Sequence, residues 1–465
     1  MGKDAKNIHL DMEARAFGAR ARGGDGLQRE HSALLWTLML GVFLGAADLN
    51  LIAPGLTAIS HAVRVTSGVG AWLVTIYAII YAVGLPIAGA LGDRYGRRGV
   101  FFAGAIVFAV GSLLAGLSHT LTMLLIARGV QALGASALIP LATAEIGTAF
   151  SPARRGALLG AVGAVYGLAA VVGPPIGAVL VAYVGWRWLF FATVPIAAAV
   201  ALLAALSFPE AVERRAIPLD ILGALLTAAA VGALLLGFEF IHRGDLPFGV
   251  ASIIFGALLL PNLGFWERSA SGSIFGRIDL RGGMGLAYAL GILSAAGMVV
   301  ALFVPLYGLR ELHLTEVQSG VALLPMALAA AVTSWWGGRL TDRVGPMPVL
   351  AAGFLLLAGG AYAVPALGGM VGLGLGLVLV GGGVGLTMGA PLQYLVLGLA
   401  PKGQSSAAVA MLGTFRALGT AAGPVLYASF LPVFAQLFLA AAGVGVAGLL
   451  AALLLWGSQP RPNMV

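Results

Sequence analysis

The stretch Gly89-Ala90-Leu91-Gly92-Asp93-Arg94-Tyr95-Gly96-Arg97-Arg98-Gly99 separates two long apolar runs, one ending near Gly89 and the next starting at Val100. It carries three arginines and one aspartate. A short basic loop between two membrane helices is expected on the cytoplasmic side. Its glycines allow a sharp turn and a close approach of backbones, and Asp93 suits the positive end of a helix. The stretch therefore predicts a tight cytoplasmic turn between two transmembrane helices.

The rest of the composition agrees with a membrane protein. Of the 465 residues, 60% are hydrophobic and only 9% are charged, and the mean hydropathy is +0.99, whereas a soluble domain has about 25% charged residues. Continuous apolar runs of about 20 residues recur, each long enough to span the hydrocarbon core. Because the runs do not alternate in polarity, helices are favoured over a barrel. The 69 glycines allow those helices to pack closely.

Composition also excludes several kinds of chemistry. The absence of cysteine excludes disulfides, thiolate metal sites and a cysteine nucleophile. The six histidines are scattered, and no Gly-x-x-x-x-Gly-Lys-Ser/Thr nucleotide loop occurs. The net charge of +8 reflects membrane topology and is no sign of nucleic-acid binding. We therefore expect no enzyme activity, metal, cofactor or nucleic-acid partner, and a chain that works as a monomer among membrane lipids.

Fourteen apolar runs are expected to be transmembrane helices. They cover residues 34–57, 70–90, 99–118, 121–146, 156–182, 187–207, 220–241, 249–267, 284–308, 316–338, 347–367, 371–398, 404–430 and 432–457. With the N-terminus inside, 20 of the 26 lysines and arginines fall on the cytoplasmic side, four fall in outer loops and two lie inside spans. This bias predicts that both termini are cytoplasmic, with tails at 1–33 and 458–465.

An internal repeat divides the chain into two halves. A second copy of the loop, Gly338-Arg339-Leu340-Thr341-Asp342-Arg343-Val344-Gly345, follows the first by 249 residues, counted from Asp93 to Asp342. Gly173-Pro174 and Gly423-Pro424 lie 250 residues apart, and Pro140 and Pro391 lie 251 apart. The offsets predict six-helix halves at 34–207 and 284–457, joined by a linker at 208–283 that contains two extra transmembrane helices.

The loop resembles the signature of the major facilitator superfamily, G-x-L-(G/A)-D-R-x-G-R-(K/R), at every constrained position. The resemblance implies a transporter with two similar halves that alternate access to a site near the bilayer midplane. It also implies that the loop residues form a conformational gate. Glu145, at the end of the fourth span, is expected to pair with Arg97, although it could instead be an inner proton site. The predicted gate comprises Gly89, Asp93, Arg94, Gly96, Arg97, Arg98, Glu145, Asp342 and Arg343.

Asp48 lies inside the first span, where a charged side chain costs about 2.5–3.5 kcal/mol and must face the protein interior or a wet cavity. Its surroundings resemble the first-helix motif of the fourteen-span drug:proton antiporters, so Asp48 is a candidate protonation site. The alternative is a structural partner for a buried arginine. Arg128 begins Arg128-Gly129-Val130-Gln131, which is similar to the second motif of the superfamily. It would tune the protonation of Asp48 or simply fasten two helices by a static ion pair.

The fifth span carries a glycine- and proline-rich pattern that resembles the antiporter motif of export proteins. Its residues are Gly163, Gly167, Gly173, Pro174, Pro175 and Gly177. Glycines at this spacing make a smooth face for a helix of the other half, and the prolines bend the span. Ordinary close packing of helices is the alternative interpretation.

Arg416 lies within the thirteenth span, where a lone arginine needs a counter-charge, a carbonyl group or water. We expect it to pair with Asp48 as a proton-sensitive latch between the halves, with binding to carbonyls or lipid headgroups as the alternative. Asp48, Arg128 and Arg416 together form the predicted proton-coupling set. A weaker prediction places seven polar residues around a substrate cavity: Asn50, Tyr77, Tyr81, Gln131, Tyr166, Gln393 and Tyr394.

The function implied by the resemblance is proton-driven export of a lipophilic or amphiphilic, drug-like molecule across the cell membrane, with a cationic compound as one option. Export of a lipid or a native amphiphilic metabolite is the main alternative, because the same apolar walls suit both. A membrane sensor that transports nothing is a third possibility. A flux assay under an imposed pH gradient separates the transporter from the sensor.

Overall fold

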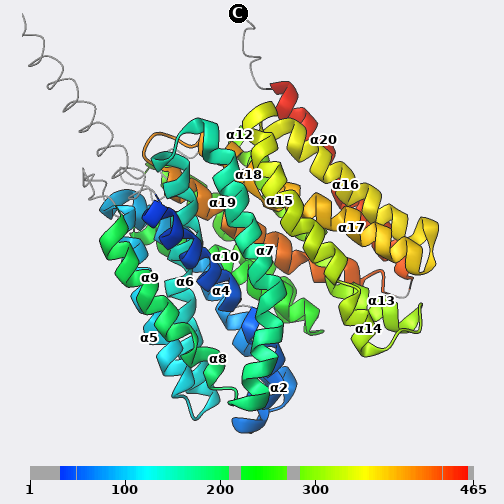
Figure 1. The fold of residues 1–465 in the computed structure, drawn as a ribbon, viewed down its shortest axis with the longest axis horizontal. Coiled ribbons are helices and arrows are strands. Elements are labelled where there is room, and N and C mark those ends of the chain that lie inside the picture. The colour runs from blue at the N-terminus through cyan, green and yellow to red at the C-terminus, as the bar shows by residue number, and fades with distance from the viewer. Residues whose placement is uncertain (1–31, 49, 209–220, 270–282, 432, 459–465) are drawn as a thin grey trace, which may run out of the picture.

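The computed structural model describes residues 32–48, 50–208, 221–269, 283–431 and 433–458, and these contain helices and no strand (Figure 1). Thirteen helical segments within these ranges are long and apolar enough to cross a membrane, and α11 (Leu246–Ser269) adds the shorter apolar stretch Leu246–Leu260. These account for the fourteen predicted spans. The predicted tails fall almost wholly outside the described residues.

The elements of the N-terminal half are a helix over 32–48 and 50–51, η1 (Ala53–Gly55), α2 (Leu56–Ala62), α3 (Ser67–Gly70), α4 (Trp72–Tyr95), α5 (Arg97–Gly116), α6 (Leu121–Ala149), α7 (Pro152–Tyr183), α8 (Trp188–Phe191) and α9 (Thr193–Ser207). The C-terminal half comprises α12 (Gly283–Met298), η2 (Val299–Phe303), α13 (Val304–Arg310), α14 (Glu316–Val321), α15 (Leu324–Val344), α16 (Pro346–Leu367), α17 (Gly369–Met388), α18 (Ala390–Leu399), α19 (Ser405–Ala428) and α20 (Phe434–Ser458). The inserted pair is α10 (Ile221–His242) and α11.

The repeat is visible in where the helices break. The first span of each half changes to a 3-10 turn, η1 or η2, and then continues as a short helix, α2 or α13. Pro54 and Pro305 lie at these breaks, where a residue without a backbone N–H favours interruption of the helix. One pair of prolines differs: Pro140 lies inside the continuous α6, whereas Pro391 follows the break between α17 and α18.

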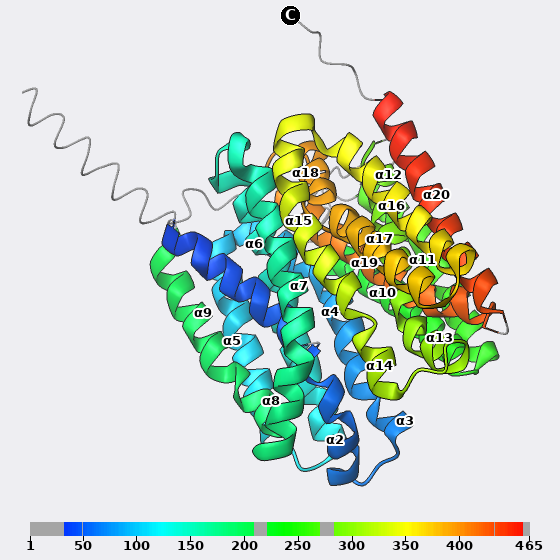
Figure 2. The same ribbon diagram turned by 45° about the vertical axis from the view of Figure 1, so that its right-hand side comes forward.

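The halves meet along two seams, α7 against α15 and α4 against α19. Along the first seam, glycines of α7 face α15. The two backbones come so close that a larger side chain at these glycines would not fit. A Cβ on Gly160 would lie 2.8 Å from the Ser334 carbonyl oxygen and 3.1 Å from the Gly338 Cα. The two bundles meet where the C-terminal ends of α4 and α15 lie, and they diverge toward α2 and α13 (Figures 1 and 2).

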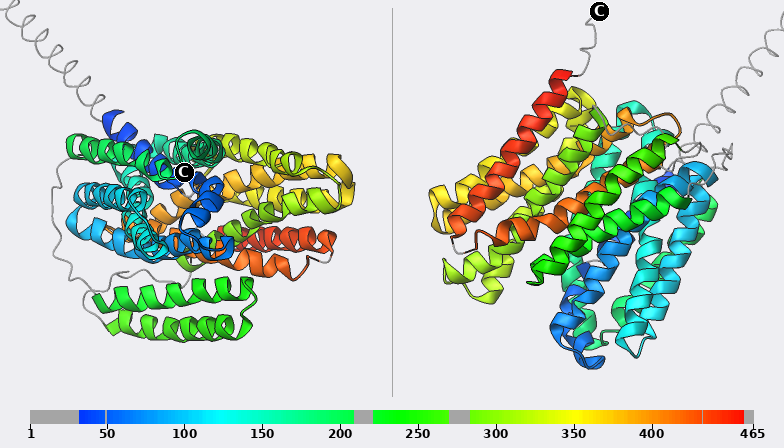
Figure 3. Two further views of the ribbon diagram at one scale, coloured as in Figure 1. Left: turned by 90° about the horizontal axis from the view of Figure 1, so that it is seen from below. Right: turned by 180° about the vertical axis from the view of Figure 1, so that it is seen from behind.

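The inserted pair lies beside the two bundles, as Figure 3 shows in the view from below. α10 packs on both α4 and α19, and Val231 and Leu235 of α10 form an apolar cluster with Ala82 of α4. At one end of α10, Arg243 pairs with Glu239 at 2.6 Å, and Arg243 also donates to the Gly68 carbonyl oxygen at 3.1 Å. The Arg243–Gly68 contact and a hydrogen bond from Thr75 to Glu239 at 3.2 Å fasten α10 to the N-terminal half, while Ala417 and Leu418 of α19 join the apolar cluster.

Replacement of Gly160 by alanine is expected to destabilise the protein by about 1–3 kcal/mol, the usual cost of overpacking, because the new methyl group meets the backbone of α15. Gly359→Ala is the matched control, since a Cβ on Gly359 meets nothing within 4 Å. Thermal unfolding of both purified variants measures the difference. Equal melting temperatures would show that the seam does not depend on close backbone approach.

Candidate functional site

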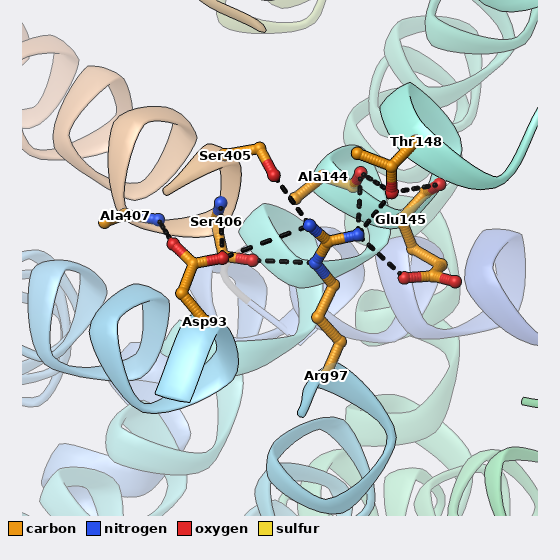
Figure 4. Close-up of polar contacts among 8 residues, drawn as sticks. All are labelled: Asp93, Arg97, Ala144, Glu145, Thr148, Ser405, Ser406 and Ala407. Carbon is orange, nitrogen blue, oxygen red and sulfur yellow. Dashed lines mark hydrogen bonds and ion pairs between the residues drawn. The ribbon is translucent and has the colours of Figure 1, made fainter. Parts of the chain in front are cut away.

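Asp93 holds the N-terminus of a helix that belongs to the other half. Its two carboxylate oxygens accept from the backbone amides of Ser406 and Ala407 at 3.1 and 2.8 Å (Figure 4). These residues lie in the first turn of α19, whose N–H groups have no partner within the helix. The negative charge also faces the positive end of the helix dipole. Asp93 therefore acts as a cap supplied across the seam between α4 and α19.

Arg97 extends this contact with five further acceptors (Figure 4). It donates to Glu145 at 2.9 Å and to the Ala144 carbonyl oxygen at 3.2 Å on α6, and also to Thr148. Across the seam it donates to the hydroxyls of Ser405 at 2.6 Å and Ser406 at 2.9 Å. The predicted contact between Arg97 and Glu145 is present, and its gating role stays a prediction.

Asp342 contacts the equivalent positions on the opposite seam. Its carboxylate accepts from the amides of Gly156 and Ala157 in α7 at 2.7 and 2.8 Å. The positions 156 and 157 precede 406 and 407 by the same 250 residues that separate the two halves, but they lie in the second turn of α7, which begins at Pro152. Each half therefore holds one helix of the other through a carboxylate, and the end of the molecule with Asp93 and Asp342, here called the capped end, is closed.

The remaining gate residues have local roles. Gly96 has φ 91°, which favours glycine at this turn, and a Cβ on Gly89 would lie 2.7 Å from the Ser406 carbonyl oxygen. Arg98 donates to the Ala205 carbonyl oxygen of α9 at 2.6 Å. Arg94 lies 4.9 Å from the Tyr95 ring centroid, and Arg343 is exposed. Neither Arg94 nor Arg343 makes a hydrogen bond or ion pair across a seam in the described part of the chain.

Asp48 is sealed inside the N-terminal half with Arg128. Their side chains pair at 2.6 Å, and Asp48 and Arg128 are 2% and 0% exposed. Gln131 donates to the other Asp48 oxygen at 2.7 Å and accepts from Arg128 at 2.7 Å. Both the charge of Asp48 and its hydrogen-bonding capacity are thus matched, which is the condition for a stable ion pair in a medium of low polarity.

Neighbouring groups complete this cluster. Gln131 also contacts the Ser112 hydroxyl at 2.8 Å, and Ser112 accepts from Thr193 at 3.0 Å. The Arg128 guanidinium donates to the Leu73 carbonyl oxygen at 3.3 Å and lies 4.0 Å from the Tyr77 ring centroid. Five spans of one half therefore contribute to the surroundings of Asp48.

The predicted pair of Asp48 and Arg416 is wrong for this conformation. Asp48 is occupied by Arg128 and Gln131 within its own half. Arg416 instead donates to the Thr387 carbonyl oxygen of α17 at 3.4 Å. The sequence placed both arginines at membrane depth, but only the packing of the helices decides which arginine meets the aspartate.

The antiporter-like pattern of α7 faces two different partners. Gly163 lies against Ser334 of α15, and Gly167 lies near Ala331 of the same helix. Gly173 instead meets Asn50, and Gly177 meets Leu51, both in the first span of the same half. The prediction of a face against the other half is thus wrong for Gly173 and Gly177. Pro174 and Pro175 lie inside the continuous α7 between these contacts.

The predicted cavity residues separate into three groups. Tyr77 and Gln131 are fully buried in the Asp48 cluster, and Gln393 is only 7% exposed, so the prediction that these three line an open cavity is wrong in this conformation. Asn50 bonds to the Ala46 carbonyl oxygen of its own helix at 2.8 Å, and Tyr394 packs beside the apolar core of the N-terminal half. Tyr81 and Tyr166 remain candidates, since Tyr81 is half-buried and Tyr166 is 40% exposed.

Comparisons with known proteins agree with this architecture. The family model described as Major Facilitator Superfamily matches residues 38–424. The chain belongs to this superfamily. It is 32% identical over 426 residues to the uncharacterized MFS-type transporter YfiU of Bacillus subtilis, covering 86% of this chain and 80% of YfiU. It is 29% identical to the multidrug transporter protein MdtP of the same organism, covering 76% of this chain and 69% of MdtP.

Solved structures of major facilitators share the fold. The human organic anion transporter MFSD10 (TETRAN) superposes with a TM-score of 0.65 at 19% identity, covering 90% of this chain and 99% of that one. The proton:xylose symporter XylE superposes with a TM-score of 0.64 at 15% identity, covering 92% and 95%. The protein is therefore a multi-pass membrane transporter of the major facilitator superfamily and not an enzyme.

Several residues of this major facilitator's sites were missed by sequence reasoning. The serines and amides at the start of α19, the amides of Gly156 and Ala157, and Ser112 carry no charge, so nothing in the pattern singled them out. The repeat held one usable signal. Because Asp93 and Asp342 are equivalent, the partners of one aspartate predict those of the other at an offset of 250 residues.

Asp93→Asn is expected to favour conformations in which the halves separate at the capped end, because an amide has one acceptor oxygen where the carboxylate uses two, and it carries no charge to face the helix dipole. Asp342→Asn should do the same, and the double variant should shift further. The chain has no native cysteine, so spin labels at Ser151→Cys and Lys402→Cys report the distance across this end. Glu311→Gln, an exposed acid outside the network, is the control. An unchanged distance distribution in the double variant would contradict the gating role.

A double-mutant cycle should couple Asp48 to Arg128 and not to Arg416. Asp48→Asn and Arg128→Gln each leave a buried charge unpaired, at a cost of about 3–5 kcal/mol, so their combination should cost less than the sum. Asp48→Asn with Arg416→Gln should be additive within about 0.5 kcal/mol. Unfolding free energies measure both cycles. Strong coupling to Arg416 would restore the latch hypothesis.

Proposed function

We propose that this transporter exports lipophilic or amphiphilic small molecules in exchange for protons by alternating access. In this proposal it works as a monomer in the cell membrane, with the capped end and both termini on the cytoplasmic side. The single observation that carries the proposal is the buried Asp48–Arg128 pair, an acid at membrane depth whose one counter-charge among the described residues is an arginine of the same half.

Protonation of Asp48 would change the balance between conformations. The neutral carboxyl group would no longer compensate the Arg128 charge, which lies fully buried among Tyr77, Leu73 and Gln131. A buried cation without a partner is costly, so conformations that hydrate Arg128 or offer it another acceptor would gain in population. The coupling comes from this difference in stability between states, as any ligand-driven change must.

The two aspartate caps supply the barrier that such a change must overcome. Opening the capped end requires the amides of Ser406, Ala407, Gly156 and Ala157 to exchange a carboxylate for water. Because water can replace the lost hydrogen bonds at this end, the free-energy cost of opening is limited, and the closed state can open and form again. This arrangement supports alternating access in which both seams open together.

The proposed substrate class rests on the relatives. MdtP is named a multidrug transporter, and the chain is also similar to the multidrug resistance protein 3 of Bacillus subtilis. Apolar helices with few charges suit a lipophilic cargo, which supports export of drug-like molecules.

In proteoliposomes under an imposed pH gradient, Asp48→Asn should abolish proton movement driven by lipophilic dyes. The variant loses stability because Arg128 is left unpaired, so Asp48→Asn with Arg128→Gln is the second test, in which no net charge remains buried. Both variants should bind dye and fail to transport it against a gradient, whereas Glu311→Gln should transport normally. Proton-driven transport by the folded double variant would contradict the proposal. If dye drove no more proton movement in liposomes with the wild-type protein than in empty liposomes, the result would favour a sensor.

A further inference from the structure

Arg416 lies at the middle of α19. It lies eleven residues after the start of α19 and twelve before its end. Thr387 of α17 accepts a hydrogen bond from it, and Tyr81 of α4 and Tyr166 of α7 lie close enough to interact with it electrostatically. Four helices, two from each half, therefore converge on one guanidinium group.

This guanidinium lacks a counter-charge. No ion pair within 4.0 Å links Arg416 to a carboxylate in the described ranges. Its side-chain hydrogen bond within the described chain, to the Thr387 carbonyl oxygen, is long at 3.4 Å, and its Nε is buried without a partner there. The fully buried charges of the described chain, Asp48, Arg128 and Glu145, are all paired. Arg416 thus carries unmatched positive charge at membrane depth, which is costly unless something else neutralises it.

Arg416 is partly accessible, as is Tyr166 of the other half. Gly163 and Gly167 turn one face of α7 toward α15 of the other half, and Tyr166 lies beside that face, one residue from Gly167. Tyr166 is 40% exposed, and Arg416 is half-buried. Tyr166 and Arg416 are also equivalent positions of the repeat, 250 residues apart. In this fold a substrate is reached from both halves near the bilayer midplane, which suits two accessible positions at mid-helix.

We propose that Arg416, with Tyr81 and Tyr166, binds the anionic group of the transported molecule, so that the substrate is an amphiphile bearing a carboxylate, sulfonate or phosphate. This inference rests on the proposed transport function and names its substrate class. A guanidinium group binds such groups through two parallel hydrogen bonds. The two tyrosines can add hydroxyl donors and aromatic surface for the apolar part. The cationic substrate that the sequence left open would meet repulsion here.

The anion site lies next to the proton site. Tyr81 stacks on Tyr77, with ring centroids 6.2 Å apart and ring planes at 8°. The Arg128 guanidinium in turn lies 4.0 Å from the Tyr77 ring centroid. Two stacked rings thus separate the bound anion from the Asp48–Arg128 pair. A substrate that moves Tyr81 would press on the residue that packs against Arg128.

Binding of two probes with the same ring and opposite charge tests the proposal. The probes are 1-naphthaleneacetate and 2-(1-naphthyl)ethylammonium, titrated by calorimetry into protein in neutral phosphatidylcholine nanodiscs without a pH gradient. The wild-type protein should bind the acetate at least about tenfold more tightly, as expected for a charge-assisted contact. Arg416→Gln should abolish this preference, and Arg416→Lys should keep part of it. Arg154→Gln, which removes an exposed charge elsewhere, should leave it unchanged.

A second variant tests the proposal even if Arg416→Gln does not fold. Tyr166→Glu replaces an exposed residue and gives Arg416 the carboxylate that it lacks, so the protein should keep or raise its melting temperature and lose the acetate preference. Retention of the preference in a folded Arg416→Gln or Tyr166→Glu protein would overturn the proposal, as would stronger binding of the ammonium probe by the wild type.

The source of the anion is settled by repeating the titration in nanodiscs that contain anionic phosphatidylglycerol. If this lipid competes with the acetate probe, the site binds a lipid headgroup. If it does not compete, the site binds a free amphiphile. Either result supports an anion site. Because binding needs no gradient, an intact acetate preference without proton-driven flux would contradict the antiport proposal alone.

Discussion

The carboxylates of Asp93 and Asp342 each bind two backbone amides of a helix in the other half, in the first turn of α19 and the second turn of α7, and these two contacts hold the halves together at one end. The first amides of a helix need an acceptor from outside it. When that acceptor belongs to the other half, the hydrogen bonds stabilise the conformation in which the two halves are in contact. The capped helices, α19 and α7, also carry Arg416 and Tyr166, so opening the capped end moves the groups that meet at the centre.

The charges inside the transporter fall into three arrangements with different consequences. Asp48 and Arg128 are paired within one half, which lets them persist while the halves move. Arg97 joins Glu145 of its own half to serines of the other, so its contacts must be partly remade in each cycle. Arg416 has no carboxylate partner among the described residues and is available to a ligand. Because unpaired charge is costly in the membrane interior, this last arrangement is the one most easily explained by binding.

The inserted helices break the symmetry of the molecule. α10 lies on α4 and α19, while the equivalent seam between α7 and α15 has no such cover within the described chain. The hydrogen bonds of Arg243 to Gly68 and of Thr75 to Glu239 fasten α10 to the N-terminal half, whereas its neighbours on α19, such as Ala417 and Leu418, offer apolar surface. Apolar surfaces slide with little directional penalty, so α10 can follow one half while the other moves past it.

The sequence by itself determined the helical membrane fold and the repeat, and it singled out the loop residues Asp93 and Arg97 that contact the other half, because hydrophobic runs, loop glycines and charges are properties of single segments. It also placed Glu145 beside Arg97 correctly. It did not determine that Asp48 meets Arg128 instead of Arg416, that Gly173 and Gly177 face the first span, or that uncharged amides of α7 and α19 complete the gate. Those outcomes depend on helix rotation and on which backbones approach closely, and a difference of a fraction of a helical turn, invisible in composition or spacing, decides which side chain reaches its partner.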